Sequence, residues 1–247
     1  MSAAAPLPGR QTPMPVLANE VDTILHKAAT MAAEWLNGHG DRKHKVVEWR
    51  SPAELAAELG DLAPRAGGRP LEELLGECRR ILARSVRTGH PGFANQLYGG
   101  WDLAGLLGEW MTALLDTSMY TYEVAPVLTL IEAEVVKTLA RKAGFPDGEG
   151  AFAPGGSLAN LMAALVARDE KWPQARRKGM PVGVRPVLFV SREAHYSVAR
   201  AAAVLGFGTD AVRMVDVDAR GCMRPRALDR ALQIARARGE RPFLVVA

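Results

Sequence analysis

Three short apolar runs near the end of the chain alternate with segments of helical periodicity, and this order restricts the fold more than any other feature. The runs are PVLFVS at 186–191, DAVRMVDVD at 210–218 and PFLVVA at 242–247. Helical segments around 195–205 and 225–238 separate them. The order strand, helix, strand, helix, strand predicts an α/β fold in which helices cover a mostly parallel sheet.

The part of the chain before residue 150 is predicted to be helical. Helical spacing of apolar residues extends over 17–36, 51–83, 103–115 and 127–143. Ser51, followed by proline, is typical of a helix N-cap, and Gly144 of a helix C-terminus. We expect a flexible tail at 1–15, a helical arm with a substrate loop at 16–100, and an incomplete cofactor-binding large domain at 101–247.

The composition excludes several function classes. A formal charge of +4, from 31 basic and 27 acidic residues, does not favour nucleic acid as a partner. No apolar run is long enough for a membrane span, and the first residues lack the pattern of a signal peptide. Cys78 and Cys222 lie far apart without metal-ligand spacing. We therefore expect a cytoplasmic protein with reduced thiols and no metal site.

Gly155, Gly156 and Ser157 directly precede an apolar run with helical spacing. If this turn ends a strand and opens a helix, it presents free N–H groups and the positive end of the helix dipole, which suit a phosphate. The neighbouring residues match neither a dinucleotide fingerprint nor a Walker loop. The alternative is an empty turn in which Ser157 is the N-cap.

Two more stretches carry polar groups at positions that are typical of ligand binding. His195 follows the predicted strand 186–191 at the edge where open α/β sheets bind ligands, although a capping or surface histidine is the alternative. Asn95 and Gln96 stand between Phe93 and Tyr98 in a stretch without helical or strand periodicity. That mixture is typical of a substrate-recognising loop, with plain packing as the alternative.

The chain resembles the group II pyridoxal-5′-phosphate-dependent amino-acid decarboxylases. Five motifs carry this resemblance, in the order and spacing of that family: HPGFANQLYGG (90–100), TSMYTYEVAPVLTLIE (117–132), FAPGGSLANLMAALVAR (152–168), SREAHYSVARAAAVLG (191–206) and DARGCMRPRALDRAL (218–232). The resemblance implies the large domain of a fold-type I pyridoxal-phosphate (PLP) enzyme. The Asn95-Gln96 pair is similar to the glutamate and cysteine-sulfinate branch rather than the aromatic branch.

The resemblance also implies a role for each candidate residue. Gly155, Gly156 and Ser157 would hold the cofactor phosphate, and His195, the candidate catalytic residue, would stack on the pyridine ring. Asn95 and Gln96 would bind the substrate. Tyr120 would reach the active site of the other subunit in a homodimer. The implied reaction is decarboxylation of an L-amino acid to an amine and CO2.

The family's Schiff-base lysine and the aspartate that pairs with the pyridine nitrogen have no counterpart in these 247 residues. Lys137, Lys142 and Lys171 lie on predicted helix surfaces, where a solvated charge is the simpler interpretation. We therefore expect the N-terminal part of a longer enzyme, inactive by itself. The alternatives are a non-catalytic truncated paralogue that serves as a dimerisation subunit, or another fold-type I enzyme such as an aminotransferase or carbon-carbon lyase.

Overall fold

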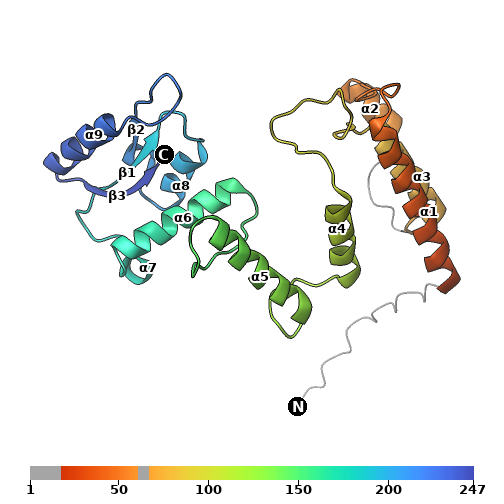
Figure 1. The fold of residues 1–247 in the computed structure, drawn as a ribbon, viewed down its shortest axis with the longest axis horizontal. Coiled ribbons are helices and arrows are strands. Elements are labelled where there is room, and N and C mark those ends of the chain that lie inside the picture. Colours follow the sequence, from red (N-terminus) through yellow and green to blue (C-terminus); the bar gives the residue numbers. More distant parts are fainter. Residues whose placement is uncertain (1–17, 61–66) are drawn as a thin grey trace, which may run out of the picture. The chain divides into compact units, whose positions relative to one another are not determined.

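The computed structural model describes residues 18–60 and 67–247 (Figure 1). The tail predicted at 1–15 lies outside these residues. The chain divides into two compact units, 1–117 and 118–247. This division falls after Thr117, whereas the sequence analysis places its domain boundary after residue 100; the predicted domain limits stay a prediction.

In the first unit, the described residues form helices joined by irregular segments. Their bounds are α1 (Ala18–Asn37), a 3-10 helix (Gly38–Gly40), α2 (Pro52–Leu59), α3 (Leu71–Arg84) and α4 (Leu103–Leu115). The predicted N-cap at Ser51 is confirmed, since its hydroxyl accepts from the N–H of Glu54 while the Glu54 carboxylate accepts from the N–H of Ser51. The imidazole of His39 is buried between the indoles of Trp35 and Trp101, at ring-centroid distances of 5.2 and 6.2 Å.

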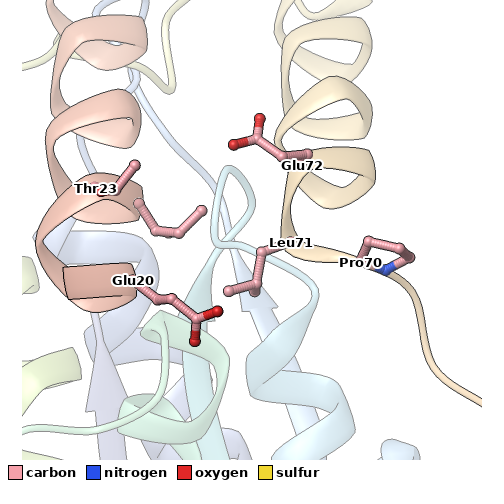
Figure 2. Close-up of a pocket in the computed structure, with 6 residues that line it drawn as sticks. Glu20, Thr23, Pro70, Leu71 and Glu72 are labelled. Atoms are coloured by element: carbon pink, nitrogen blue, oxygen red, sulfur yellow. The ribbon is translucent and has the colours of Figure 1, made fainter. Parts of the chain in front are cut away.

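A groove of about 550 Å³ lies between the starts of α1 and α3 in the first unit (Figure 2). Thr23, Leu71 and two carboxylates, Glu20 and Glu72, are among its lining residues. Glu72 also forms an ion pair with Lys27 of α1. None of the candidate site residues lines this groove.

The second unit contains the sheet and its covering helices. The elements are α5 (Pro126–Lys142), α6 (Gly156–Lys171), α7 (Ala175–Lys178), β1 (Pro186–Ser191), α8 (Ser197–Val204), a 3-10 helix (Thr209–Ala211), β2 (Val212–Val215), α9 (Pro225–Ala237) and β3 (Arg241–Val246). The helix α5 ends as predicted, with Gly144 at φ 89° and the N–H of Phe145 bonded to the carbonyl of Ala140.

The sheet has the order β2-β1-β3, and both pairs of strands are parallel, as the sequence predicts. The central strand β1 is buried on both faces because its apolar side chains alternate between two layers. Val187 and Phe189 pack with α9, whereas Leu188 and Val190 pack with α8. The helices α9 and α8 thus cover opposite faces of the sheet (Figure 1).

The turn at Gly155 does not directly follow a strand, in contrast to the strand-to-helix turn considered from the sequence. Residues 149–155 form no strand in the second unit. Only Ala-Phe-Ala separates Gly150 from Pro154, and Pro154 lacks the N–H group that a ladder requires. An irregular segment therefore leads into α6.

Candidate active site

The Gly-Gly-Ser turn forms the start of α6. Gly155 is the N-cap and has a φ of 95°, a conformation that glycine adopts without strain. The helix begins at Gly156, so Ser157 lies inside the first turn, and the alternative that made Ser157 the N-cap is wrong. The physical reason is that the positive φ places the change of direction at Gly155, two residues earlier.

The first two N–H groups of α6, those of Gly156 and Ser157, are free to bind a ligand. The N–H groups of Leu158 and Ala159 bond to the carbonyl of Gly155 at 3.1 and 3.2 Å. For the N–H groups of Gly156 and Ser157, no acceptor occurs among the described residues. A side-chain atom added at Gly155 or Gly156 would meet nothing within 4 Å. The turn is thus open, and its free donors point to an anion at a helix N-terminus.

His195 lies between the end of β1 and the start of α8, where the sequence places it. Its Nδ1 is 3.2 Å from the backbone nitrogen of Ser197, the first residue of α8, whose N–H donates to it. The side chain is otherwise exposed, and its ring stacks on Tyr196 at a centroid distance of 4.0 Å. The imidazole therefore caps α8 while keeping a free edge, so the capping alternative and a ligand-binding role are compatible.

The turn and His195 are brought together by the packing of α6 on α8. Asn160 of α6 donates a hydrogen bond of 2.8 Å to the hydroxyl of Ser197, which in turn lies 2.8 Å from Nδ1 of His195. Ser157 and Arg200 line a shared groove of about 330 Å³ between the two helices. The structure thus joins two sequence motifs that are about 40 residues apart.

Asn160, Ser197 and Arg200 lie beside the candidate residues and are not predicted from the sequence. The guanidinium of Arg200 lies over the ring of Tyr196, with Cζ 4.3 Å from its centroid. Asn160 and Ser197 stand three and two residues after Ser157 and His195. Their closeness in the sequence to the predicted residues is a signal that could have identified them. The contact between Asn160 and Ser197, however, joins positions 37 residues apart and depends on how α6 packs on α8.

Tyr120 lies in the irregular segment before α5, and its side chain is 87% exposed. The neighbouring Met119 has a φ of 52°, which is uncommon for a residue with a side chain. The segment therefore presents Tyr120 to its surroundings rather than packing it into the second unit.

Asn95 and Gln96 belong to the first unit, whereas the other candidate residues belong to the second. Both side chains are exposed. The carboxamide oxygen of Asn95 accepts a hydrogen bond of 2.8 Å from the N–H of Leu97, and the rings of Phe93 and Tyr98 contact edge to face at 6.0 Å. The side chain of Asn95 thus stabilises the conformation of its own loop.

The lysines of the second unit that the sequence analysis weighed are solvent-facing. Lys137 is exposed on α5, with its ammonium 4.0 Å from the carboxylate of Glu134. Lys142 is exposed at the last position of α5. Lys171 ends α6, so roughly 22 Å of helix separates it from the turn at Gly156.

The described residues contain neither a candidate metal-binding cluster nor a candidate membrane-spanning helix. Across residues 18–60 and 67–247, no group of three or more His, Cys, Asp or Glu side chains is arranged to hold a metal ion. None of the helices in these ranges combines the length and apolar character that crossing a bilayer requires.

Comparisons with known proteins identify the family. Residues 52–247 match the pyridoxal-dependent decarboxylase conserved domain. The cysteine sulfinic acid decarboxylase of Rattus norvegicus is 45% identical over 203 residues, which cover 82% of this chain and 41% of that protein. The acidic amino acid decarboxylase of Homo sapiens is 44% identical over 207 residues, covering 84% and 40%. The chain thus spans about two fifths of the length of these relatives.

Solved structures agree with this result. Mouse CSAD in its apo form has a TM-score of 0.87 and 41% identity, covering 91% of this chain and 48% of that one. Oryza sativa TDC with PLP and tryptamine has a TM-score of 0.81, covers 95% of this chain and 52% of that one, and at 20% identity is alike in fold. The fold-type I α/β prediction is confirmed. The chain belongs to the pyridoxal-dependent decarboxylase family, whose cofactor is pyridoxal 5′-phosphate.

Proposed function

We propose that the whole protein containing this chain converts an L-amino acid into an amine and CO2, with PLP bound at the start of α6. The single observation that carries this proposal is the pair of free N–H groups at Gly156 and Ser157, in a turn tied to His195 through α6 and α8. Family membership supports the reaction class.

The residues present fit a phosphate group. The N–H groups of Gly156 and Ser157 and the exposed Ser157 hydroxyl supply three donors, and the open space at Gly155 lets an anion approach the backbone. The imidazole of His195 offers a flat ring for a planar cofactor. When bound, the cofactor supplies an electron sink for the electron pair that the departing CO2 leaves behind.

We propose an acidic amino acid as the substrate. Two observations support this choice: the curated relatives are named for cysteine sulfinic acid and acidic amino acids, and the exposed Asn95 and Gln96 carry amide donors suited to a carboxylate or sulfinate.

We also propose a cytoplasmic homodimer in which Tyr120 completes the site of the other subunit. The exposure of Tyr120 supports the assembly, because an aromatic side chain gains most from burial against a partner. Cys78 and Cys222 are free and exposed, which is typical of a reducing compartment.

We propose further that residues 1–247 alone do not decarboxylate. The solvent-facing positions of Lys137, Lys142 and Lys171 support this, since covalent attachment needs a lysine at the cofactor's aldehyde.

The test is an assay of the whole purified protein with added PLP. Release of CO2 from L-glutamate, L-aspartate and L-cysteine sulfinate is compared with release from L-tryptophan. In parallel reactions pyruvate is added as the amino-group acceptor, and formation of the substrate's keto acid is measured. We expect CO2 and amine from at least one acidic substrate. Keto-acid formation without CO2 would indicate an aminotransferase, and no turnover of any substrate would contradict the proposal.

A further inference from the structure

Three polar side chains form one hydrogen-bonded chain beside the candidate phosphate turn. The carboxamide nitrogen of Asn160 lies 2.8 Å from the hydroxyl oxygen of Ser197, and that oxygen lies 2.8 Å from Nδ1 of His195. Ser197 is 1% exposed, Asn160 is half-buried and His195 is exposed. The chain thus runs from the packed face of α6 to the free edge of the imidazole.

The backbone fixes the direction of these hydrogen bonds. The N–H of Ser197 can only donate, and it points to Nδ1 of His195 at 3.2 Å. Nδ1 is therefore an acceptor, so the Ser197 hydroxyl beside it donates its single proton to the same nitrogen. The hydroxyl oxygen in turn accepts from the amide of Asn160, and each donor has an acceptor.

We propose that Asn160 and Ser197 are positioning residues that hold the neutral imidazole of His195 with its proton on Nε2. This inference rests on the proposed function, because it concerns the histidine placed against the cofactor. Its consequence is chemical. With the Nδ1 lone pair engaged by two donors, the exposed nitrogen is a hydrogen-bond donor, so neutral His195 offers a ligand an N–H group and a ring face but no base at Nε2.

The substitution Asn160→Asp reverses the chain with little change in shape. At about pH 8 an aspartate is ionised and only accepts hydrogen bonds. The Ser197 hydroxyl then donates to residue 160 and can no longer donate to Nδ1. The backbone N–H of Ser197 still donates to Nδ1. We therefore expect a mixture in which the Nδ1–H form of His195 appears beside the Nε2–H form, because that proton now finds an acceptor in the Ser197 oxygen.

The measurement is solid-state 15N NMR of the whole protein, labelled at histidine and free of cofactor, since directly bonded protons distinguish the two nitrogens. The His195 signals are those lost in His195→Gln. We expect the Nε2–H form in the wild type and in Ser197→Thr, which keeps the hydroxyl. Asn37→Asp adds the same charge at an exposed position on α1 and is expected to leave the His195 signals unchanged.

Two results would overturn the proposal: a wild-type protein with the proton on Nδ1, or a folded Asn160→Asp variant that keeps the wild-type spectrum. If Asn160→Asp does not fold, Ser197→Ala replaces it. Only the backbone N–H then holds Nδ1, and we expect a mixture of both forms; an unmixed wild-type spectrum would contradict the role of the hydroxyl.

Activity gives a second measurement that is independent of the first. In the holoenzyme, Asn160→Asp is expected to lower kcat by roughly 10- to 100-fold, whereas Asn37→Asp, far from the site in sequence and exposed, should keep the wild-type rate. The spectra need no PLP, so the two proposals fail separately. A wild-type protein that neither binds PLP nor releases CO2 contradicts the proposed function, whereas the protonation pattern of His195 decides the present inference.

Discussion

The guanidinium of Arg192 donates a hydrogen bond of 2.7 Å to the carboxylate of Asp216, joining the residues that follow β1 and β2. The backbone supports the same junction, because the N–H of Arg192 bonds to the carbonyl of Val215 at 3.0 Å. The loop that leads to His195 therefore starts from a fixed point at the carboxyl edge of the sheet.

This ion pair predicts a specific acid dependence of stability. The hydrogen bond from Arg192, followed by the charge of that guanidinium, lowers the pKa of Asp216 below its ordinary value of 3.8. A lowered pKa in the folded state contributes stability that is present above the ordinary value and lost as the pH falls through the folded-state value. Wild type should therefore exceed Asp216→Asn in stability at neutral pH, by an amount that shrinks below about pH 4.

Urea unfolding of both proteins across that pH range measures the effect. Asp147→Asn removes the same charge from an exposed turn after α5 and serves as the control. A stability difference for Asp216→Asn that persists unchanged at the lowest pH would show that the ion pair is not its source.

Phe189 should be the most costly side chain of β1 to truncate. It is 0% exposed and packs between β1 and α9 with Val187 and Val215. Replacing a buried phenylalanine by alanine removes apolar contacts and leaves a cavity, at a cost of about 3–5 kcal/mol. Equilibrium unfolding of Phe189→Ala tests this. Phe152→Ala serves as the control, because the side chain of Phe152 is 58% exposed. A loss below about 1 kcal/mol would contradict the assigned core.

His195→Ala should reduce turnover far more than stability. The imidazole accepts hydrogen bonds from the backbone N–H and the hydroxyl of Ser197 and is otherwise exposed, so its loss removes little packing. A role against the cofactor predicts a decrease in kcat of roughly 10²–10⁴-fold. Steady-state kinetics and thermal unfolding of the same sample separate the two effects, and turnover near the wild-type rate would leave His195 as a helix cap alone.

Tyr120 should act on the partner's site. Mixing Tyr120→Phe with His195→Ala yields hybrid dimers in which one site has an intact His195 from one subunit and an intact Tyr120 from the other. Random exchange should then restore up to about a quarter of the wild-type activity. Absence of recovery, with subunit exchange demonstrated by a tag on one variant, would place Tyr120 in its own subunit's site or outside any site.

Elements with strong local signals could be predicted from the sequence, and β1 is the clearest case. Its uninterrupted run PVLFVS gave the bounds that the structure shows. The run at 210–218 gave a strand that is longer than β2, because Thr209–Ala211 forms a 3-10 helix and Asp216 leaves the ladder beside Arg192. Local apolar periodicity does not report such competing contacts.

The candidate site also has a part that the sequence predicts and a part that it does not. The Gly155 turn and the place of His195 follow from glycine chemistry and the strand ends, both of which are local. The contact of Asn160 with Ser197 depends on how α6 packs on α8, and a residue pattern carries no direct signal for it. The alternative in which Ser157 is the N-cap rests on side-chain preference, which carries no information on the positive φ that makes Gly155 the N-cap.

The central claim is that PLP is bound through the start of α6, and its affinity for Gly156→Leu tests that claim most directly. A leucine at this position covers the free N–H groups but meets no neighbouring atom within 4 Å at its Cβ, so the fold is retained. Gly40→Leu introduces the same side chain at another open glycine and serves as the control. Absorbance titration of the whole protein with PLP should show at least about tenfold weaker binding for Gly156→Leu and wild-type binding for Gly40→Leu. Equal PLP affinity for wild type and Gly156→Leu would contradict the account.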